Sequence, residues 1–260
     1  MHIHIILVGT SLIRNLAKER SSYLTLEELN IVKEWAFKID DERALFYIGH
    51  GSIFKEALQY VNELPKKASA ELNALYSLLE EYKGLRIDKA ILIRTDTYLG
   101  AFCSKVLSEH LKNYKPEEYT VHKLGKVFEE GIANLLDTIT SICREHRDDI
   151  IYLNATGGFK PESGIALLAA ALGGAHYAYY MHEAFRKPRL IPLIPLIPDE
   201  QLLRQAIQLE NKPAEILNKL PPGVRIRLIS LLDITQENRL KLREWLRAWK
   251  RIINTRSIRP

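Results

Sequence analysis

Residues 150–180, IIYLNATGGFKPESGIALLAAALGGAHYAYY, constrain the fold more than any other part of the chain. The apolar run 150–153 predicts a buried strand, and a helix rich in small residues is expected to begin near residue 161. The loop 154–160 between them contains two adjacent glycines. In α/β proteins such a loop lets the backbone approach an anion, and the free N–H groups of the helix start bind it. Lys160 adds a positive charge, so we predict a phosphate site and a nucleotide ligand.

The rest of the chain continues the same alternation of apolar runs and amphipathic stretches. Strands are expected at His2–Val8, Ala44–Ile48, Lys89–Ile93, Tyr119–His122, Ile150–Asn154 and His176–Tyr180. Helices are expected at Ile53–Leu64, Ser69–Tyr82, Leu99–Lys112 and Lys126–His146. This order predicts an α/β fold, a mostly parallel sheet with helices on both faces. LIPLIPLIP (190–198) is expected to end this domain as a strand or an extended connector.

Residues 199–260 form a different kind of segment. They hold 13 Lys/Arg against 7 Asp/Glu, whereas residues 1–198 hold 24 against 25. We predict a mainly helical appendage: a helix over 199–220, a turn at 221–223, a short helix or strand over 225–233, and a final helix over 236–254 capped by Thr235. The basic charge suits nucleic acid, but a solvated helix face is the favoured explanation. Trp245 and Trp249, four residues apart, are most simply a core-facing pair.

Composition excludes several classes of protein. Cys103 and Cys143 lie in expected helices without metal-ligand spacing, which argues against a disulfide framework or a zinc site and fits a cytoplasmic protein. The N-terminus lacks the charged region of a signal peptide, and no apolar stretch is long enough for a membrane span. There is no P-loop motif and no G-x-G-x-x-G. We expect no metal and no cofactor.

Three loops are expected to meet at the carboxyl edge of the sheet, where ligands of such folds bind. They are Gly9-Thr10-Ser11, Arg94-Thr95-Asp96-Thr97 and Asn154–Lys160. Ser11 could donate to a phosphate or sugar hydroxyl, or serve only as a helix cap. Asp96 or Thr97 is expected to cap the next helix, while Arg94 or Thr95 could reach a phosphate or base. Arg14 and Asn15 could line the pocket or lie on the surface.

These motifs resemble a known family. The GTS loop, the ASAELNAL stretch (68–75), the RTDTYLG loop and above all LNATGGFKPE are similar to the CRISPR-associated Rossmann fold (CARF), and more narrowly to stand-alone ring nucleases related to a hypothetical Aeropyrum protein. The resemblance covers about residues 1–198. It implies a CARF domain there, a two-fold homodimer, and a cleft that binds cyclic tetra-adenylate. The resemblance does not extend to residues 199–260, and a winged helix or a lid is considered for them.

The resemblance also implies a reaction and its residues. A ribose 2′-OH would attack the adjacent phosphate without a metal, giving linear di-adenylate with a 2′,3′-cyclic phosphate. Ser11, with Thr10 as competitor, would orient the ribose and phosphate, and Lys160 would stabilise the developing charge. Further ligand-binding residues are expected among Gly9, Thr10, Arg14, Asn15, Arg94, Thr95, Asp96, Asn154, Thr156, Gly157, Gly158 and Phe159.

Two alternatives to the enzyme remain open. One is a transcriptional regulator that responds to a cyclic oligoadenylate, with residues 199–260 binding DNA through a basic helix. The other is a sensor without catalysis. A structural role is also considered for the tail, which would pack on the partner's Rossmann domain and close over the ligand as a lid. The effector ribonuclease called HEPN is disfavoured, because residues 199–260 contain no histidine for its Arg-x(4–6)-His motif.

Overall fold

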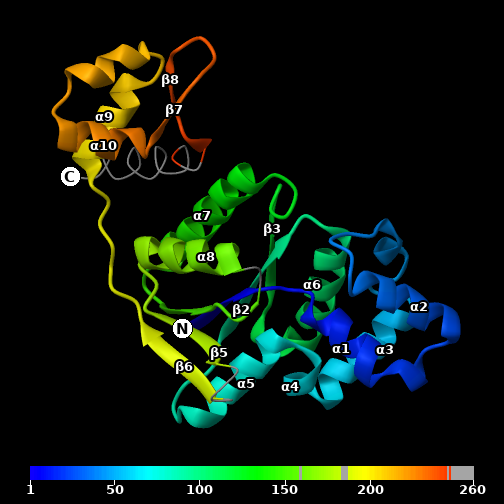
Figure 1. The fold of residues 1–260 in the computed structure, drawn as a ribbon. Helices are drawn as coiled ribbons and strands as arrows, with labels where there is room; N and C mark the ends of the chain where they lie inside the picture. The colour runs from blue at the N-terminus through cyan, green and yellow to red at the C-terminus, as the bar shows by residue number, and fades with distance from the viewer. Residues whose placement is uncertain (158–159, 183–186, 245, 247–260) are drawn as a thin grey trace.

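The computed structural model describes residues 1–157, 160–182, 187–244 and 246, with the backbone alone for Lys160 and His182. Six strands form one sheet in the order β3-β2-β1-β4-β5-β6 (Figure 1). Their bounds are β1 His2–Leu7, β2 Lys89–Thr95, β3 Glu117–Val121, β4 Ile150–Asn154, β5 Tyr177–His182 and β6 Lys187–Pro192. All neighbours pair in parallel except β5 and β6, which are antiparallel. The predicted α/β class and Rossmann-like sheet are confirmed.

Helices cover both faces of this sheet (Figure 1). One apolar core contains side chains of α7 (Phe128–Glu145) and α8 (Lys160–Gly173). The other contains side chains of α1 (Ser11–Glu19), α2 (Leu26–Trp35), α3 (Ser52–Glu63), α4 (Pro65–Ala68), α5 (Ala70–Glu81) and α6 (Tyr98–His110). Along β1, Ile3 and Ile5 belong to the first core and Ile6 to the second. Successive side chains of the strand therefore enter the two cores in alternation, as expected for a sheet buried on both sides.

Local sequence sets several of the helix starts. Thr25 forms a capping box with Glu28, and the Ser69 hydroxyl accepts from Leu72 N at the start of α5. The expectation that Asp96 or Thr97 caps α6 is met by Thr97, whose hydroxyl accepts from Gly100 N at 3.0 Å. Asp96 instead accepts from Lys123 N at 2.9 Å.

The strand expected at Ala44–Ile48 is wrong. Residues Glu42–Phe46 form a 3₁₀ helix, η2, whose cap Asp41 accepts from Arg43 N. Ala44 is buried, but Leu45 and Phe46 are 51% and 73% exposed, so the apolar run does not enter the core. A short apolar run is compatible with either structure, and here the capping carboxylate favours the turn.

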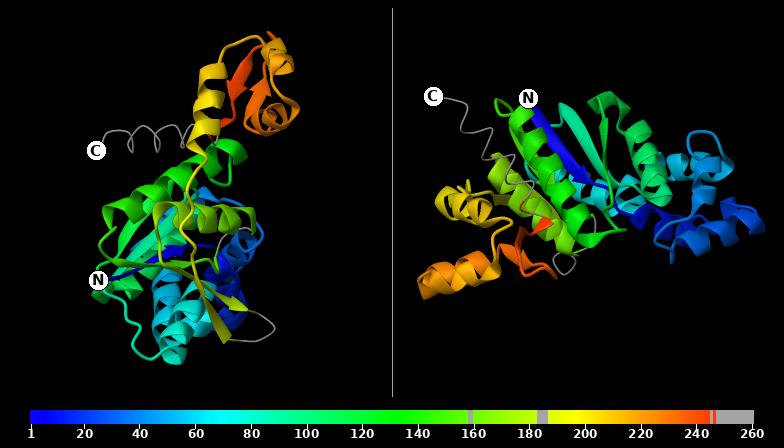
Figure 2. Two further views of the ribbon diagram at one scale, coloured as in Figure 1. Left: turned by 90° about the vertical axis from the view of Figure 1, so that its left-hand side faces the viewer. Right: turned by 90° about the horizontal axis from the view of Figure 1, so that it is seen from above.

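Residues 187–198 lead out of the sheet domain. β6 lies at the sheet edge beside β5, and the remaining LIPLIP segment is an extended connector, as expected (Figures 1 and 2). The prolines fit these positions because they cannot donate to a central ladder.

Beyond the connector lies a small unit of helices and a hairpin (Figures 1 and 2). Its elements are α9 (Glu200–Leu209), η4 (Ala214–Lys219), α10 (Pro222–Ile229), β7 (Leu232–Ile234) and β8 (Leu240–Leu242). The expected helix over 199–220 is interrupted by a turn with positive φ at Asn211, and Pro222 begins α10 instead of remaining in a turn.

The helix expected from residue 236 is wrong over its first part. Residues 235–239 form the turn of the β7–β8 hairpin, and Asn238 takes the left-handed conformation there. Thr235 accepts from Arg239 N at 3.2 Å, so it stabilises a hairpin turn and not a helix start. Trp245 and Trp249 lie outside the described residues. In the described part of the chain, no helix is both long and apolar enough to cross a membrane.

Candidate functional site

A cavity of about 650 Å³ opens at the carboxyl edge of the sheet. The loops after β1, β2 and β4 contribute to it, together with the first turn of α5 and the segment after α2. The sheet order places β1 between β2 and β4, so the chain connections diverge on the two sides of β1. Ligands of open α/β sheets bind at such a reversal of strand order.

The lining includes seven of the residues predicted from sequence: Gly9, Thr10, Ser11, Arg14, Thr95, Thr156 and Gly157. It also includes residues that the sequence did not single out, among them Phe37, Lys38, Glu71 and Glu162. The structure thus brings the three expected loops together at one cavity. The role of each residue there stays a prediction.

Glu71 is the residue that organises the cavity floor. Its side chain is 1% exposed, yet it borders the cavity. One carboxylate oxygen accepts from Gly9 N at 2.8 Å, and the other accepts from Ser11 Oγ at 3.1 Å and from Ser69 Oγ. No Lys or Arg of the described residues forms an ion pair with it. Within the described part of the chain, Glu71 is therefore a buried carboxylate held by neutral donors.

These contacts alter the expected role of the GTS loop. The Gly9 N–H and the Ser11 hydroxyl, which we expected to face an anion, both donate to Glu71. Ser11 Oγ also accepts from Ala70 N at 3.0 Å. A hydroxyl has one proton and two lone pairs, so Ser11 retains a single acceptor position for a ligand.

The loop after β4 is tied to the same residue. Asn154 is fully buried, donates to the main-chain oxygen of Glu71 at 2.9 Å, and accepts from Thr156 N at 3.1 Å. A side chain at Gly157 would place its Cβ 2.3 Å from Leu7 O and 2.5 Å from Glu71 Oε1. Only glycine fits there, because the loop backbone packs directly on β1 and on the carboxylate. Asn154 is thus a loop-positioning residue that does not line the cavity.

Two polar groups of the lining have no partner among the described residues. The Thr10 hydroxyl makes no hydrogen bond there, and the exposed guanidinium of Arg14 makes no ion pair. Both lie on the first turn of α1 or just before it, where the helix dipole also favours negative charge. An anionic ligand entering the cavity would find these two groups free.

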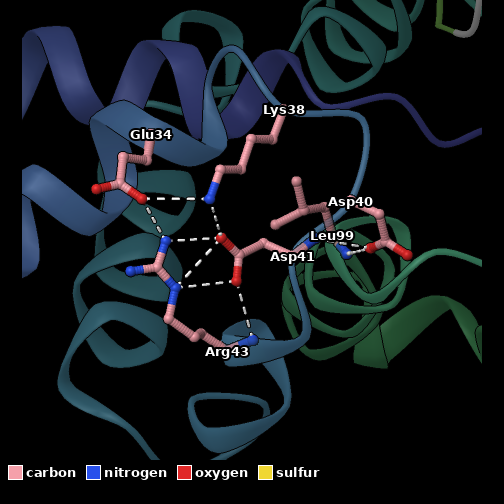
Figure 3. Close-up of polar contacts among 6 residues, drawn as sticks. All are labelled: Glu34, Lys38, Asp40, Asp41, Arg43 and Leu99. Carbon is pink, nitrogen blue, oxygen red and sulfur yellow. Dashed lines mark hydrogen bonds and ion pairs between the residues drawn. The ribbon is translucent and has the colours of Figure 1, made fainter.

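The segment after α2 forms one rim of the cavity and is fixed by charged residues (Figure 3). Lys38 bridges Glu34 and Asp41, and Arg43 contacts the same two carboxylates. The Arg43 guanidinium holds the pKa of Asp41 well below its ordinary value. The neighbouring Asp40 accepts from the N–H groups of Tyr98 and Leu99 at the start of α6.

This rim carries an aromatic ring into solvent. Phe37 is 93% exposed and is the aromatic residue among the described lining residues. Its backbone follows directly on α2, with Phe37 N donating to Glu34 O at 3.1 Å. The preceding Trp35 is buried against Tyr47 and Phe102. The main chain that carries the Phe37 ring is firmly anchored. The ring can therefore contact a ligand at little cost in entropy.

Besides Asn154, three more predicted site residues lie away from the lining and have structural contacts. Asn15 donates to the main-chain oxygens of Lys67 and Ala68, joining α1 to α4. Arg94 donates to Thr95 O at 3.0 Å. Asp96 accepts from Lys123 N at 2.9 Å, as noted above for the helix cap. None of the three lines the cavity.

The loop after β4 contains three more predicted residues, which are described only in part. Gly158 and Phe159 lie outside the described residues, and Lys160 is described as the first residue of α8 without its side chain. The placement of its ammonium group relative to the cavity therefore stays a prediction, as does its catalytic role.

Other titratable groups serve the fold. His4 is buried, and burial lowers its pKa to about 4. Burial raises the pKa of the Cys143 thiol to about 12 and that of Cys103 further still. Among the described residues, no group of three or more His, Cys, Asp or Glu side chains could hold a metal ion.

Glu71 is the important residue that sequence reasoning missed. It lies within the quoted ASAELNAL stretch, on the same face of α5 as the buried Ala74, Leu75 and Leu78. A carboxylate on the apolar face of a helix is unusual unless it is paired or functional. The position of Glu71 on the apolar face of the helix is the sequence signal that could have identified it.

Comparison with known families agrees with part of the resemblance inferred from these motifs. Residues 66–194 match the model of a family described as CRISPR-associated protein (Cas_APE2256). The match includes Glu71, β2, β4 and the loop that begins at Asn154. This segment, which supplies two of the three loops at the cavity, is therefore similar to CRISPR-associated proteins.

Proposed function

We propose that the protein is a ring nuclease that binds cyclic tetra-adenylate in a two-fold dimer cleft and cleaves it to linear di-adenylate with a 2′,3′-cyclic phosphate. One observation carries the proposal: three loops meet at one cavity at the reversal of strand order, and two of them belong to a segment similar to CRISPR-associated proteins. Such an enzyme would end a signal made during type III CRISPR defence.

The polar lining suits a phosphodiester ligand. Arg14 supplies an unpaired cation and Thr10 an unpaired hydroxyl among the described residues, beside the N-terminus of α1. Lys160 at the start of α8 would stabilise the charge that develops on the phosphate during attack by the 2′-OH. These groups provide positioning and electrostatic stabilisation, and the nucleophile belongs to the substrate.

The rim suits the bases of the same ligand. Phe37 offers an exposed ring on an anchored segment, and a base stacked on an aromatic ring gains about 1–3 kcal/mol. A cyclic ligand with four identical nucleotides has two-fold symmetry, so two protomers could present the same loops to opposite halves of it. The homodimer is part of this proposal.

The test is direct. Purified protein is incubated with cyclic tetra-adenylate in EDTA, and products are separated by chromatography and identified by mass. We expect linear di-adenylate ending in a 2′,3′-cyclic phosphate. Lys160→Ala should lower the rate about 10²–10³-fold while leaving some binding.

Lys55→Ala is the matched control, because Lys55 is an exposed residue of α3 outside the cavity lining. Unchanged turnover by Lys160→Ala would remove that residue from the mechanism. Binding without any product from the wild-type protein would favour a sensor without catalysis.

The order of elements in residues 199–242 supports a second candidate, a regulator that binds DNA. Two helical segments, η4 and α10, meet at Leu220-Pro221, and a β7–β8 hairpin follows. Pro213 pairs with Arg239 beside that hairpin. This order, two helical segments followed by a hairpin, is compatible with a helix-turn-helix and its wing. Residues 199–244 hold eight basic and seven acidic residues, however, so their charge adds little. A mobility shift of promoter DNA that depends on the cyclic ligand would favour this candidate.

A further inference from the structure

Neither the fold nor the proposed phosphate contacts explain why the charged side chain of Glu71 is buried. A carboxylate removed from water is costly unless it is compensated. Glu71 is compensated here by a main-chain N–H and two hydroxyls, without a cation among the described residues. A substitution by an apolar residue of similar size would avoid that cost. Its position at the cavity suggests that the charge is kept for chemistry.

The contacts of Ser11 set the direction of its proton. Glu71 in its charged form can only accept hydrogen bonds, so the Ser11 hydroxyl must donate to it across 3.1 Å. The Ala70 N–H then donates to one lone pair of Ser11 Oγ at 3.0 Å. What Ser11 can offer a ligand in the cavity is its other lone pair. It can therefore receive a proton from a ligand hydroxyl, and it cannot donate one to a phosphate without leaving Glu71.

We infer that Glu71 is a positioning residue for Ser11 and the final acceptor of the proton that the ribose 2′-OH loses. This inference rests on the proposed function. The 2′-OH donates to Ser11 Oγ, and Ser11 passes its own proton to Glu71. As the 2′-oxygen bonds to phosphorus, the 5′-oxygen leaves with a proton from water. The cyclic phosphate remains, Glu71 returns its proton to solvent, and atoms and charge balance.

The surrounding loops support this role because they fix the carboxylate from several sides. Gly9 N holds one oxygen of Glu71, and Gly157 leaves the space that this oxygen occupies. Asn154 holds the main chain of the same residue. The loops after β1 and β4 therefore position one carboxylate at the cavity floor.

The first experiment compares wild-type protein with Glu71→Gln in single-turnover cleavage of cyclic tetra-adenylate. The glutamine keeps an oxygen for Gly9 N, but its NH₂ group cannot accept the Ser11 proton. We expect affinity within about threefold and a rate about 10²–10⁴-fold lower. The rate of the variant should rise about tenfold per pH unit between pH 7 and 9, because hydroxide then removes the proton.

Ser11→Ala and the double variant separate a relay from a structural effect. In a relay the two residues act as a unit, so the double variant should be no slower than the slower single variant. Losses that multiply, or a Glu71→Gln enzyme as fast as wild type, would overturn the inference while leaving the proposed function intact. Absence of product from folded wild-type protein would overturn both.

A measurement on the wild-type protein keeps the inference testable should Glu71→Gln fail to fold. Rates are recorded in mixtures of H₂O and D₂O. Two protons move in the relay, so the rate should fall along a curved line as the deuterium fraction rises. A linear dependence would mean that one proton moves, and the relay through Ser11 would be wrong.

Discussion

Acid should destabilise this protein in part through His4 of β1, a buried histidine. Its Nε2 contacts Arg86 O and its Nδ1 contacts Tyr179 OH, each at 3.1 Å. Because a carbonyl only accepts, Nε2 carries the proton and Nδ1 accepts from the tyrosine. The ring stacks on Tyr152 with centroids 4.7 Å apart. The site therefore matches a neutral imidazole, and burial lowers the pKa of His4 to about 4.

The sign and size of the effect follow from that pKa. In the unfolded chain His4 binds a proton near its ordinary pKa of 6.5, whereas in the folded chain its pKa is about 4. The stability that neutral His4 contributes is thus present above pH 6.5 and is lost as pH falls toward 4. The expected loss in the free energy of unfolding, relative to neutral pH, is about 2 kcal/mol at pH 5 and about 3 kcal/mol at pH 4.

The assay is urea unfolding of wild-type protein and His4→Phe at pH 7.5, 6 and 5. The phenylalanine keeps a ring against Tyr152 but cannot titrate. It should be less stable at neutral pH, because it leaves the Tyr179 hydroxyl and Arg86 carbonyl without their partner. Its stability should fall less steeply with acid, by about 2 kcal/mol between pH 7.5 and 5. Equal losses in the two proteins would refute the assignment to His4.

Three further perturbations test the packing and the rim of the site. Gly157→Ala should lower the free energy of unfolding by about 1–3 kcal/mol in thermal or urea unfolding, because its Cβ would meet Leu7 O and Glu71. The control is Gly164→Ala in α8, whose Cβ would meet nothing within 4 Å and which should raise the free energy of unfolding by up to about 1 kcal/mol. Thr25→Ala removes the capping box of α2 and should lower the free energy of unfolding by about 1 kcal/mol in the same assay. An unchanged unfolding midpoint would show that the cap does not contribute to stability. Phe37→Ala should weaken binding of cyclic tetra-adenylate about 5- to 100-fold in a titration, whereas Phe46→Ala, also exposed but outside the lining, should not; equal affinities would contradict base stacking by Phe37.

Elements with a strong local pattern could be predicted from sequence alone. β4 occupies Ile150–Asn154 as predicted, and α3, α5 and α6 begin and end within two residues of the expected positions. Apolar runs buried on both faces and amphipathic helices carry their signal in consecutive residues, so no distant contact is needed to recognise them. The α/β class and the meeting of three loops at one sheet edge follow from the order of these elements.

Elements whose structure depends on distant contacts could not be predicted. Where a strand was expected at Ala44–Ile48, residues Glu42–Phe46 form a 3₁₀ helix, because a cap at Asp41 and the rim ion pairs outweigh the apolar pattern. Residues 236–242 have a helical pattern, but 236–239 form a turn and 240–242 pair with β7, where Leu240 and Leu242 are buried. In both segments the competing structures differ little in local energy, so tertiary packing decides between them.

The sequence by itself determined the fold class and the meeting of three loops at one edge of the sheet, because topology follows from the order of strands and helices. Only the tertiary structure decided what each polar group in those loops contacts. Ser11 and Glu71 are separated by 60 positions in the chain, and Gly157 by many more, so no local pattern relates them. A hydrogen bond depends on ångström-scale geometry that packing alone establishes. The serine expected to face a phosphate therefore donates to a buried carboxylate.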